Sequence, residues 1–166
     1  MRPIFAIIFA MTNQLNLAIL GPGKWGTTLA TVYGYLNQKN KLFSHIYFWA
    51  RPESMAEGPV FPGLDLPKNI DLVPDLESIL AKANILICAI PSSFLPSYMP
   101  LFKKYLSPKK TLCFVNASKG VIDDQPISYY FEKHLSVIPY ATISGPNIAS
   151  QIIANFSPPF LQKKII

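Results

Sequence analysis

A glycine-rich turn between a short apolar run and a helical pattern constrains the fold more than any other feature. Residues 15–20 (LNLAIL) form the apolar run, and Gly21, Gly23 and Gly26 follow at once. An apolar run of this length that stops at glycine is typical of a buried parallel strand. From Gly26 to about Gln38, apolar residues recur at helical spacing. Strand, turn and helix together predict the start of a β-α-β unit.

Further strands and helices alternate along the rest of the chain. Strands are expected at 45–50, 85–90, 111–116 and 140–144, and helices at 75–82, 94–106, 127–134 and from about 148. The region between Arg51 and Pro74 is rich in proline and glycine, which predicts a long irregular excursion. Strands that are apolar on both faces need helices on both sides. The pattern therefore predicts an α/β fold with a doubly wound parallel sheet of the Rossmann type.

The two ends of the chain depart from this alternation. Residues 1–14 begin with Arg2 and an apolar run, and no small-residue cleavage site follows. We interpret them as an apolar leader or a misassigned start, with Met11 as the expected initiator. The run is far shorter than the roughly 20 residues that span a bilayer, so no membrane span is expected. The domain is expected at 15–154, and residues 155–166 predict an irregular tail.

Composition and charge limit the kinds of ligand and partner that this chain is expected to have. A chain of 166 residues that is 50% hydrophobic suits one globular domain. The net charge of +6 comes from scattered Lys and Arg, which favours a small anionic ligand over a nucleic acid. Cys88 and Cys113 each lie in an apolar run, so two buried free thiols and a reducing, cytoplasmic compartment are expected. His45 and His134 have no metal-ligand spacing and no evident partner, so neither a metal site nor any chemistry is assigned to them.

The glycine turn predicts a binding site for the pyrophosphate of a dinucleotide. Gly21 permits a tight turn, Gly23 leaves room for the pyrophosphate, and Gly26 lets the helix pack closely on the sheet. The helix points free backbone N–H groups at the phosphates from its first residues, next to Lys24 and Trp25. A nucleoside-triphosphate loop is excluded, because Lys24 is followed by Trp25 and not by Ser or Thr.

The end of the second strand bears on the choice between NAD and NADP. This position normally carries an acid that binds the ribose 2′-hydroxyl. Here the residues are Ala50 and Arg51. A guanidinium binds phosphate bidentately, so Arg51 favours NADP(H) over NAD(H), with Glu53 as an alternative ribose acceptor. A methyltransferase on a related sheet fits less well, since its ribose-binding acid is also expected near Ala50 and Arg51.

Three further strand ends carry candidate residues, and open α/β sheets place their ligands at such ends. Phe94 either contacts the cofactor or packs into the core. Lys119 places a cation at the same edge, with Gly120 beside it for close approach. Gly145 and Asn147 belong to a turn that opens another helix, and the Asn147 amide can donate to an oxyanion.

These segments, in their order and spacing, resemble the NAD(P)-dependent glycerol-3-phosphate dehydrogenase family. The resemblance covers about residues 15–153 and rests on GPGKWGTTLA (21–30), FWAR (48–51), FPGLDLPKNI (61–70), SKG (118–120) and SGPNIA (144–149). It corresponds to the amino-terminal cofactor domain, roughly half of a family member. The helical carboxy-terminal domain of the family is therefore expected to be absent.

The resemblance implies hydride transfer between NAD(P)H and dihydroxyacetone phosphate, giving sn-glycerol 3-phosphate for phospholipid synthesis. By position it implies cofactor contacts at Lys24, Trp25, Arg51, Lys119 and Ala149, and substrate contacts at Lys119, Gly145 and Asn147. A Lys119 ammonium near the substrate would stabilise negative charge on a carbonyl oxygen. The family's acid/base lysine belongs to the absent domain, so no catalytic residue is assigned within this chain.

Two functions stay open at this point. The chain is either an oxidoreductase of this family in truncated form, or a non-catalytic NAD(P)-binding fragment. The abrupt loss of resemblance after Ala154 predicts a truncated or frameshifted gene. A sheet surface left without its covering domain also favours association, so a homo-oligomer is among the expected states.

Overall fold

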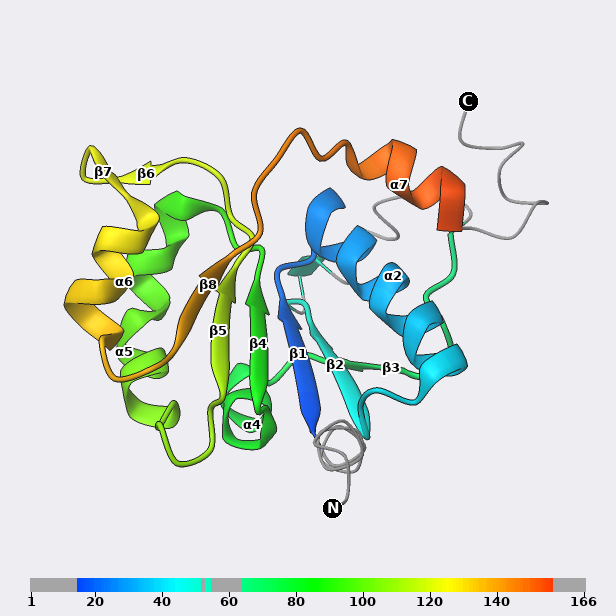
Figure 1. Cartoon of the computed structure of the whole chain (residues 1–166), viewed down its shortest axis with the longest axis horizontal. Helices are drawn as coiled ribbons and strands as arrows, with labels where there is room; N and C mark the ends of the chain where they lie inside the picture. The colour runs from blue at the N-terminus through cyan, green and yellow to red at the C-terminus, as the bar shows by residue number, and fades with distance from the viewer. Residues whose placement is uncertain (1–14, 52, 55–63, 157–166) are drawn as a thin grey trace, which may run out of the picture.

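A six-stranded parallel sheet forms the centre of the molecule in the computed structural model, which describes residues 15–51, 53–54 and 64–156 (Figure 1). Its strands are β1 (Asn16–Leu20), β2 (His45–Trp49), β3 (Ile70–Val73), β4 (Ile85–Cys88), β5 (Cys113–Asn116) and β8 (Tyr140–Thr142). The order in space is β3-β2-β1-β4-β5-β8, and each neighbouring pair is parallel. The order reverses between β1 and β4, as in a Rossmann-type sheet. The predicted fold class is confirmed.

Helices cover both faces of the sheet (Figure 1). They are α2 (Lys24–Asn40), α4 (Leu76–Lys82), η1 (Ser92–Phe94), α5 (Leu95–Tyr105), α6 (Ile127–Leu135) and α7 (Ala149–Phe156). The helices α4, α5 and α6 lie on one face, while α2 and α7 lie on the other and pack against each other. A small antiparallel hairpin of β6 (Val121–Ile122) and β7 (Gln125–Pro126) precedes α6.

The core has two parts, one on each face of the sheet. On the first face, Phe114 of β5 packs between Phe102 of α5 and Phe131 of α6, with its ring centroid 5.4 Å from that of Phe102 and 4.4 Å from that of Phe131. On the second face, Leu29 of α2 packs on a cluster that includes Ile19 of β1. Burying one such side chain contributes about 1.5–3 kcal/mol. The sheet is therefore held by apolar packing from both sides.

Local signals fix several helix boundaries as expected. The Asp75 side chain accepts a hydrogen bond from Glu77 N at 3.1 Å and caps α4. In α5, Pro96 occupies the first turn, where its missing N–H costs nothing, and Pro100 lies on the exposed side of the helix. The two cysteines are free, as predicted, and Cys88 is buried. Cys113 is only half-buried, so the expectation that both thiols are buried is wrong for Cys113.

The loop after Arg51 and the end of the last helix differ from the sequence-based expectations. The excursion after Arg51 is not irregular throughout, because residues 70–73 form β3 and pair with β2. The last helix continues to Phe156, two residues past the expected end of the domain at Ala154. The leader (1–14) and the remaining tail (157–166) lie outside the described residues.

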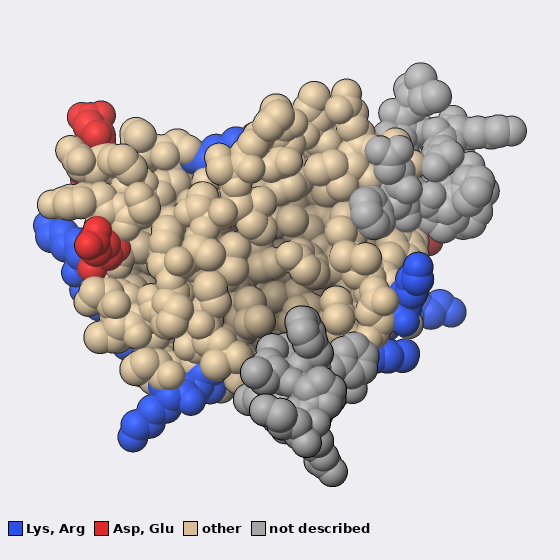
Figure 2. All heavy atoms as spheres, viewed as in Figure 1, with Lys and Arg blue, Asp and Glu red and all other residues tan. Residues whose placement is uncertain are grey.

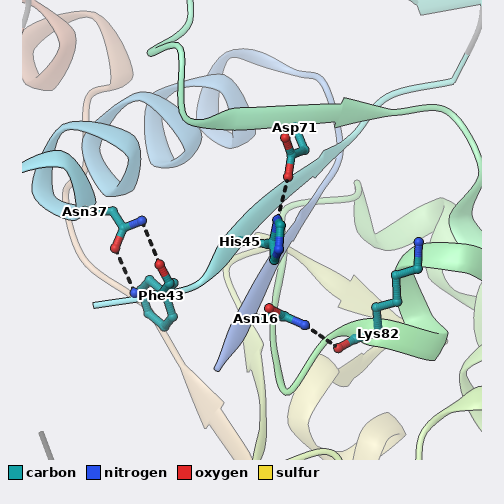
Figure 3. Close-up of polar contacts among 6 residues, drawn as sticks. All are labelled: Asn16, Asn37, Phe43, His45, Asp71 and Lys82. Atoms are coloured by element: carbon teal, nitrogen blue, oxygen red, sulfur yellow. Dashed lines mark hydrogen bonds and ion pairs between the residues drawn. The ribbon is translucent and has the colours of Figure 1, made fainter. Parts of the chain in front are cut away.

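Side-chain hydrogen bonds secure the amino ends of the strands, on the edge of the sheet opposite the glycine turn (Figure 3). The Asn16 amide donates to the Lys82 carbonyl at 3.1 Å, which joins β1 to the end of α4. The Asn37 amide bonds both backbone polar groups of Phe43, at 2.7 and 3.0 Å. His45 lies 3.1 Å from Asp71, so it does have a partner, on the strand that the sequence pattern did not reveal.

Within the described part of the chain, no helix combines the length and the apolar character needed to cross a bilayer.

Candidate functional site

The predicted site residues follow the carboxyl ends of the parallel strands. Reading across the sheet, Arg51 follows β2, the glycine turn follows β1, Phe94 follows β4, Lys119 follows β5 and Gly145 follows β8. Neighbouring strands lie about 4.8 Å apart, so these five ends form a track about 19 Å long. The strand order reverses in the middle of the track, between β1 and β4. Open α/β sheets bind their ligands at such a point.

Two glycines of the turn, Gly21 and Gly26, have no room for a side chain, whereas Gly23 does. A Cβ on Gly26 would lie 1.9 Å from the Gly21 carbonyl oxygen, and a Cβ on Gly21 would lie 2.8 Å from the Ala89 carbonyl oxygen. A Cβ on Gly23 would meet nothing within 4 Å. Gly21 and Gly26 thus keep the turn tight against β4, as predicted. Gly23 leaves free space above the backbone where a ligand can approach.

The start of α2 is arranged to receive an anion. Gly23 is its N-cap and provides no side-chain hydrogen bond, and the first turn holds no acidic residue. Free N–H groups and the positive end of the helix dipole therefore face the open side of the turn. Lys24 is exposed at this position. Trp25 is half-buried and packs on the core cluster beneath α2, so it also has a structural role.

The helix α7 lies against this first turn of α2. The Thr28 hydroxyl bonds the Lys24 carbonyl at 2.8 Å and reaches the Ala149 carbonyl at 3.5 Å. Ala149, predicted from the resemblance to border the cofactor, is thus close to the glycine turn. Thr28 was not singled out from the sequence, because a buried threonine inside a helical pattern gives no signal for a contact 121 residues away.

Arg51, just after the end of β2, is available to bind a ligand. Ala50 before it is buried, while Arg51 itself is exposed. Within the described residues the ion pairs are His45 with Asp71 and Lys104 with Glu77, so Arg51 forms none. Glu53 is also exposed and does not neutralise it.

Hydrogen bonds tie the ends of β4 and β5 together and fix the backbone before Lys119. The Asn116 side chain accepts from Ser118 N at 3.1 Å and donates to Ser118 O at 3.3 Å. The Ser118 hydroxyl lies 2.5 Å from the Ile90 carbonyl oxygen and 3.1 Å from that of Cys88. An Asn two residues before Ser in a turn is a recognisable local signal, but its link to β4 is long-range.

Cys88 lies at this strand end but cannot serve as a nucleophile at neutral pH. Burial raises the pKa of its thiol to about 12. The thiolate is the reactive form of cysteine, so the buried thiol is inert.

Lys119 and Gly145 line one pocket of about 370 Å³ between the ends of β5 and β8 and the start of α6. Ser128 and Thr142 also line it. Tyr140 lies in its wall, and burial raises the pKa of the tyrosine hydroxyl. The nearby Thr142 and Asn116 side chains lower the Tyr140 pKa in part. Among the described residues, however, no group has the geometry of a hydrogen bond with this buried hydroxyl oxygen.

The structure brings some of the predicted residues together and keeps others apart. The glycine turn and Ala149 form one group, and Lys119 with Gly145 forms another. Asn147 does not line the pocket; its backbone N–H bonds the Gly145 carbonyl at 2.8 Å. Phe94 is 51% exposed, so its alternative role as a core residue is wrong.

The sheet order, the reversal between β1 and β4, and the glycine turn on α2 define a Rossmann-type domain of the kind found in dinucleotide-dependent oxidoreductases. A family model described as the amino terminus of NAD-dependent glycerol-3-phosphate dehydrogenase matches residues 16–157. The chain belongs to this family.

Individual relatives agree with this assignment. A Glycerol-3-phosphate dehydrogenase [NAD(P)+] of Teredinibacter turnerae is 28% identical over 155 residues, covering 87% of this chain and 43% of the relative. One of Corynebacterium aurimucosum is 31% identical over 150 residues, covering 82% and 42%. The solved glycerol-3-phosphate dehydrogenase of Plasmodium falciparum superposes with a TM-score of 0.74 at 27% identity, covering 92% of this chain and 46% of that one. The chain thus spans less than half the length of these relatives.

Proposed function

We propose that this chain is the dinucleotide-binding part of an NAD(P)-dependent glycerol-3-phosphate dehydrogenase. In this proposal NAD(P)H lies along the carboxyl edge of the sheet. The observation that carries the proposal is the open position at Gly23, directly on the uncapped start of α2. Names of relatives that specify NAD(P)+ or NAD(+) support the cofactor class.

The residues present fit such a cofactor. Gly23 and the first N–H groups of α2 would hold the pyrophosphate, with Gly21 and Gly26 maintaining the turn and Lys24 and Trp25 beside it. Arg51 would bind at the adenosine ribose. Phe94, Lys119 and Ala149 would border the rest of the cofactor. Arg51 forms no ion pair with another described residue, and Ala149 lies close to α2, which supports these roles.

The substrate proposal rests on the pocket that Lys119 and Gly145 share. When bound, the nicotinamide supplies the hydride that reduces dihydroxyacetone phosphate to sn-glycerol 3-phosphate. The Lys119 ammonium would stabilise the negative charge that develops on the substrate carbonyl oxygen. Gly145 and Asn147 would border the substrate.

A second function, binding without turnover, is favoured by one observation. The titratable residues that line the Lys119 pocket are Lys119, which is already assigned to the charge on the substrate oxygen, and Tyr140, whose hydroxyl is buried. Proton transfer to the developing alkoxide needs a positioned acid. In this alternative the chain holds NAD(P)H and further groups are required for the reaction.

Two measurements on the chain separate these functions. A titration of the full chain with NADPH, followed by fluorescence, measures binding, and the loss of NADPH absorbance with dihydroxyacetone phosphate measures turnover. Binding with turnover supports independent catalysis. Binding alone supports the second function, whereas no binding would contradict both.

Arg51 tests the cofactor preference. We expect the parent chain to bind NADPH more tightly than NADH, because the 2′-phosphate meets the Arg51 guanidinium. Arg51→Ala should weaken NADPH binding by roughly 1.5–3 kcal/mol, the usual value of a charged hydrogen bond, and leave NADH binding nearly unchanged. Lys82→Ala, which removes an exposed cation from the opposite edge of the sheet, is the matched control. Equal loss of both cofactors in Arg51→Ala would rule out a role at the 2′-phosphate.

The limits of the domain and its location are proposals too. The domain was expected at residues 15–154, and we now place its end at Phe156, the end of α7, which the family match to 16–157 supports. A cytoplasmic location is supported by the two free thiols, since reducing compartments keep cysteines unpaired.

A further inference from the structure

The hydroxyl group of Tyr140 is a buried donor that has no partner. Tyr140 is the first residue of β8, and its ring packs on that of Phe131 in α6, with the two centroids 5.3 Å apart. Among the described residues, its hydroxyl oxygen is the only buried side-chain nitrogen or oxygen atom without a hydrogen bond. Buried polar groups are nearly always paired, so an unpaired one needs an explanation. The binding of a ligand is such an explanation.

The Tyr140 hydroxyl points toward the pocket that Lys119 and Gly145 share. Two pockets adjoin Tyr140, this one and another beside α6. Thr142 lies two residues further along β8, on the same face, and pairs with Asn116 of β5. Both side chains act on the Tyr140 pKa, so they lie beside its hydroxyl, and both line the Lys119 pocket but not the other one. The buried hydroxyl is therefore at the floor of this pocket, and the exposed Lys119 is at its rim.

The rest of the pocket offers positive charge and hydrogen-bond donors. Among the described residues that line it, Lys119 is the only charged one. The helix α6 begins in its wall, with no side-chain cap and no acidic residue in its first turn, so free N–H groups and the positive helix end lie there. In Figure 2 the acidic side chains near the β6–β7 hairpin and α6 lie at the outer margin, apart from the basic side chain at the carboxyl edge. An anion with several acceptor oxygens matches such a pocket.

We propose that the floor of this pocket binds a phosphate group, to which the Tyr140 hydroxyl donates a hydrogen bond. Lys119 and the start of α6 supply the positive charge that balances the phosphate. The pocket volume of about 370 Å³ is in the usual range for a small ligand. Burial raises the pKa of Tyr140, so its hydroxyl keeps the proton that it donates.

Free phosphate and a small phosphate monoester share this chemistry. For a monoester, the proposal rests on the proposed function and extends it: the substrate phosphate occupies the floor, and the substrate carbonyl group lies beside Lys119 at the rim. The hydroxyl is closed to solvent, so the ligand has to displace a side chain of the wall. Exposed side chains such as Ser128 and Thr142 change rotamer within nanoseconds, so this displacement is fast.

Calorimetric titrations of the full chain test the proposal with three ligands: sn-glycerol 3-phosphate, inorganic phosphate and glycerol. Each is added to about 50 mM at constant ionic strength, which covers a Kd in the millimolar range. Both phosphate compounds should bind in this range, and glycerol should not. Tighter binding of sn-glycerol 3-phosphate supports the substrate as the source of the phosphate group, and equal binding of the two supports free phosphate.

Tyr140→Phe removes the hydroxyl and keeps the ring that packs on Phe131. This variant should bind both phosphate compounds at least about tenfold more weakly, because a hydrogen bond to a charged group is lost. Tyr129→Phe is the matched control, since Tyr129 belongs to α6, is exposed and does not line the pocket. It should change the Kd by less than about twofold. Urea unfolding should find Tyr140→Phe as stable as the parent, because the hydroxyl has no partner in the fold.

Several results would overturn the phosphate site: a parent that binds neither phosphate compound or binds glycerol equally well, unchanged affinity in Tyr140→Phe, or equal weakening by both variants. Marked destabilisation of Tyr140→Phe would also overturn it, by showing that the hydroxyl has a partner within the fold.

A parallel NADPH titration separates these failures from a failure of the proposed function. The glycine turn follows β1, whereas Tyr140 begins β8 at the edge of the sheet. NADPH should therefore bind to Tyr140→Phe within about twofold of the parent. NADPH binding without phosphate binding contradicts the phosphate site alone, whereas a parent that does not bind NADPH contradicts the proposed function.

Discussion

Gly23 and Gly26 are three residues apart in one turn, yet their surroundings differ in a way that separates folding from binding. The space around a Gly23 Cβ is empty, and its φ of −66° suits any residue. A Gly26 Cβ would overlap the Gly21 carbonyl oxygen at 1.9 Å. Gly26 is therefore needed for the fold of the turn, whereas Gly23 keeps the space beside the backbone of the turn open to a ligand.

Two single substitutions test this separation. Gly26→Ala should destabilise the chain by about 1–3 kcal/mol, because the turn must shift to admit a methyl group. Gly23→Ala should change stability by less than about 0.5 kcal/mol but weaken NADPH binding at least about tenfold, since its methyl group enters the space open to the pyrophosphate. Urea unfolding and NADPH titration of both variants measure the two effects. Tight NADPH binding by Gly23→Ala would contradict the proposed phosphate position.

Among single residues, the sequence could predict the role of those whose neighbours in the fold are also close in the sequence. Gly21, Gly23 and Gly26 could be assigned because strand, turn and helix are contiguous. Thr28 and Ser118 could not, since their partners Ala149, Cys88 and Ile90 are distant in the sequence and become neighbours only through the sheet order.

At the scale of elements, the four inner strands were predicted from apolar runs, and the edge strand β8 was predicted as well. The strand β3 at the other edge escaped prediction because Asp71 and Leu72 are exposed, so its apolar signal is weak, and because it lies within the proline-rich region after Arg51. The partner of His45 was missed for the same reason, as Asp71 belongs to β3. Helix starts with a local cap were predicted well, and α4 at Asp75 is the clearest case.

The cap of α4 gives a prediction at this scale. The helix is only 7 residues long, and the bond from Glu77 N to the Asp75 carboxylate satisfies one of the N–H groups that its first turn leaves free. Asp75→Ala should lower the free energy of unfolding by about 0.5–2 kcal/mol, whereas Asp75→Asn should keep most of it. Urea unfolding of the three proteins measures this. Equal loss in both variants would mean that the capping bond is not what stabilises α4.

At the scale of the whole molecule, β4 joins the two halves of the sheet and the two cores. It pairs with β1 on one side and β5 on the other, and Cys88 at its end is 0% exposed. The first core surrounds Cys88, and the glycine turn contacts Ala89, the residue directly after β4. The protonation state of this one thiol is therefore coupled to the folding of the whole chain.

This coupling predicts how stability depends on pH. Burial raises the pKa of the Cys88 thiol from 9.0 to about 12. Between these values the folded chain keeps the proton and the unfolded chain releases it, so the unfolded state binds fewer protons and stability falls as pH rises. The contribution is fully present below about pH 9 and decreases by at most about 1.4 kcal/mol per pH unit above it.

Other groups, including several tyrosines, titrate in the same range, so the test is a difference between two proteins. Urea unfolding of the parent and of Cys88→Ala at about pH 8, 9, 10 and 11 should show a steeper decline for the parent. Cys88→Ala is expected to be less stable at pH 8, because it leaves a cavity, and the two curves should converge as pH rises. Parallel curves would mean that Cys88 has the same thiol pKa in the folded and unfolded chains, and that β4 is open to solvent near the site.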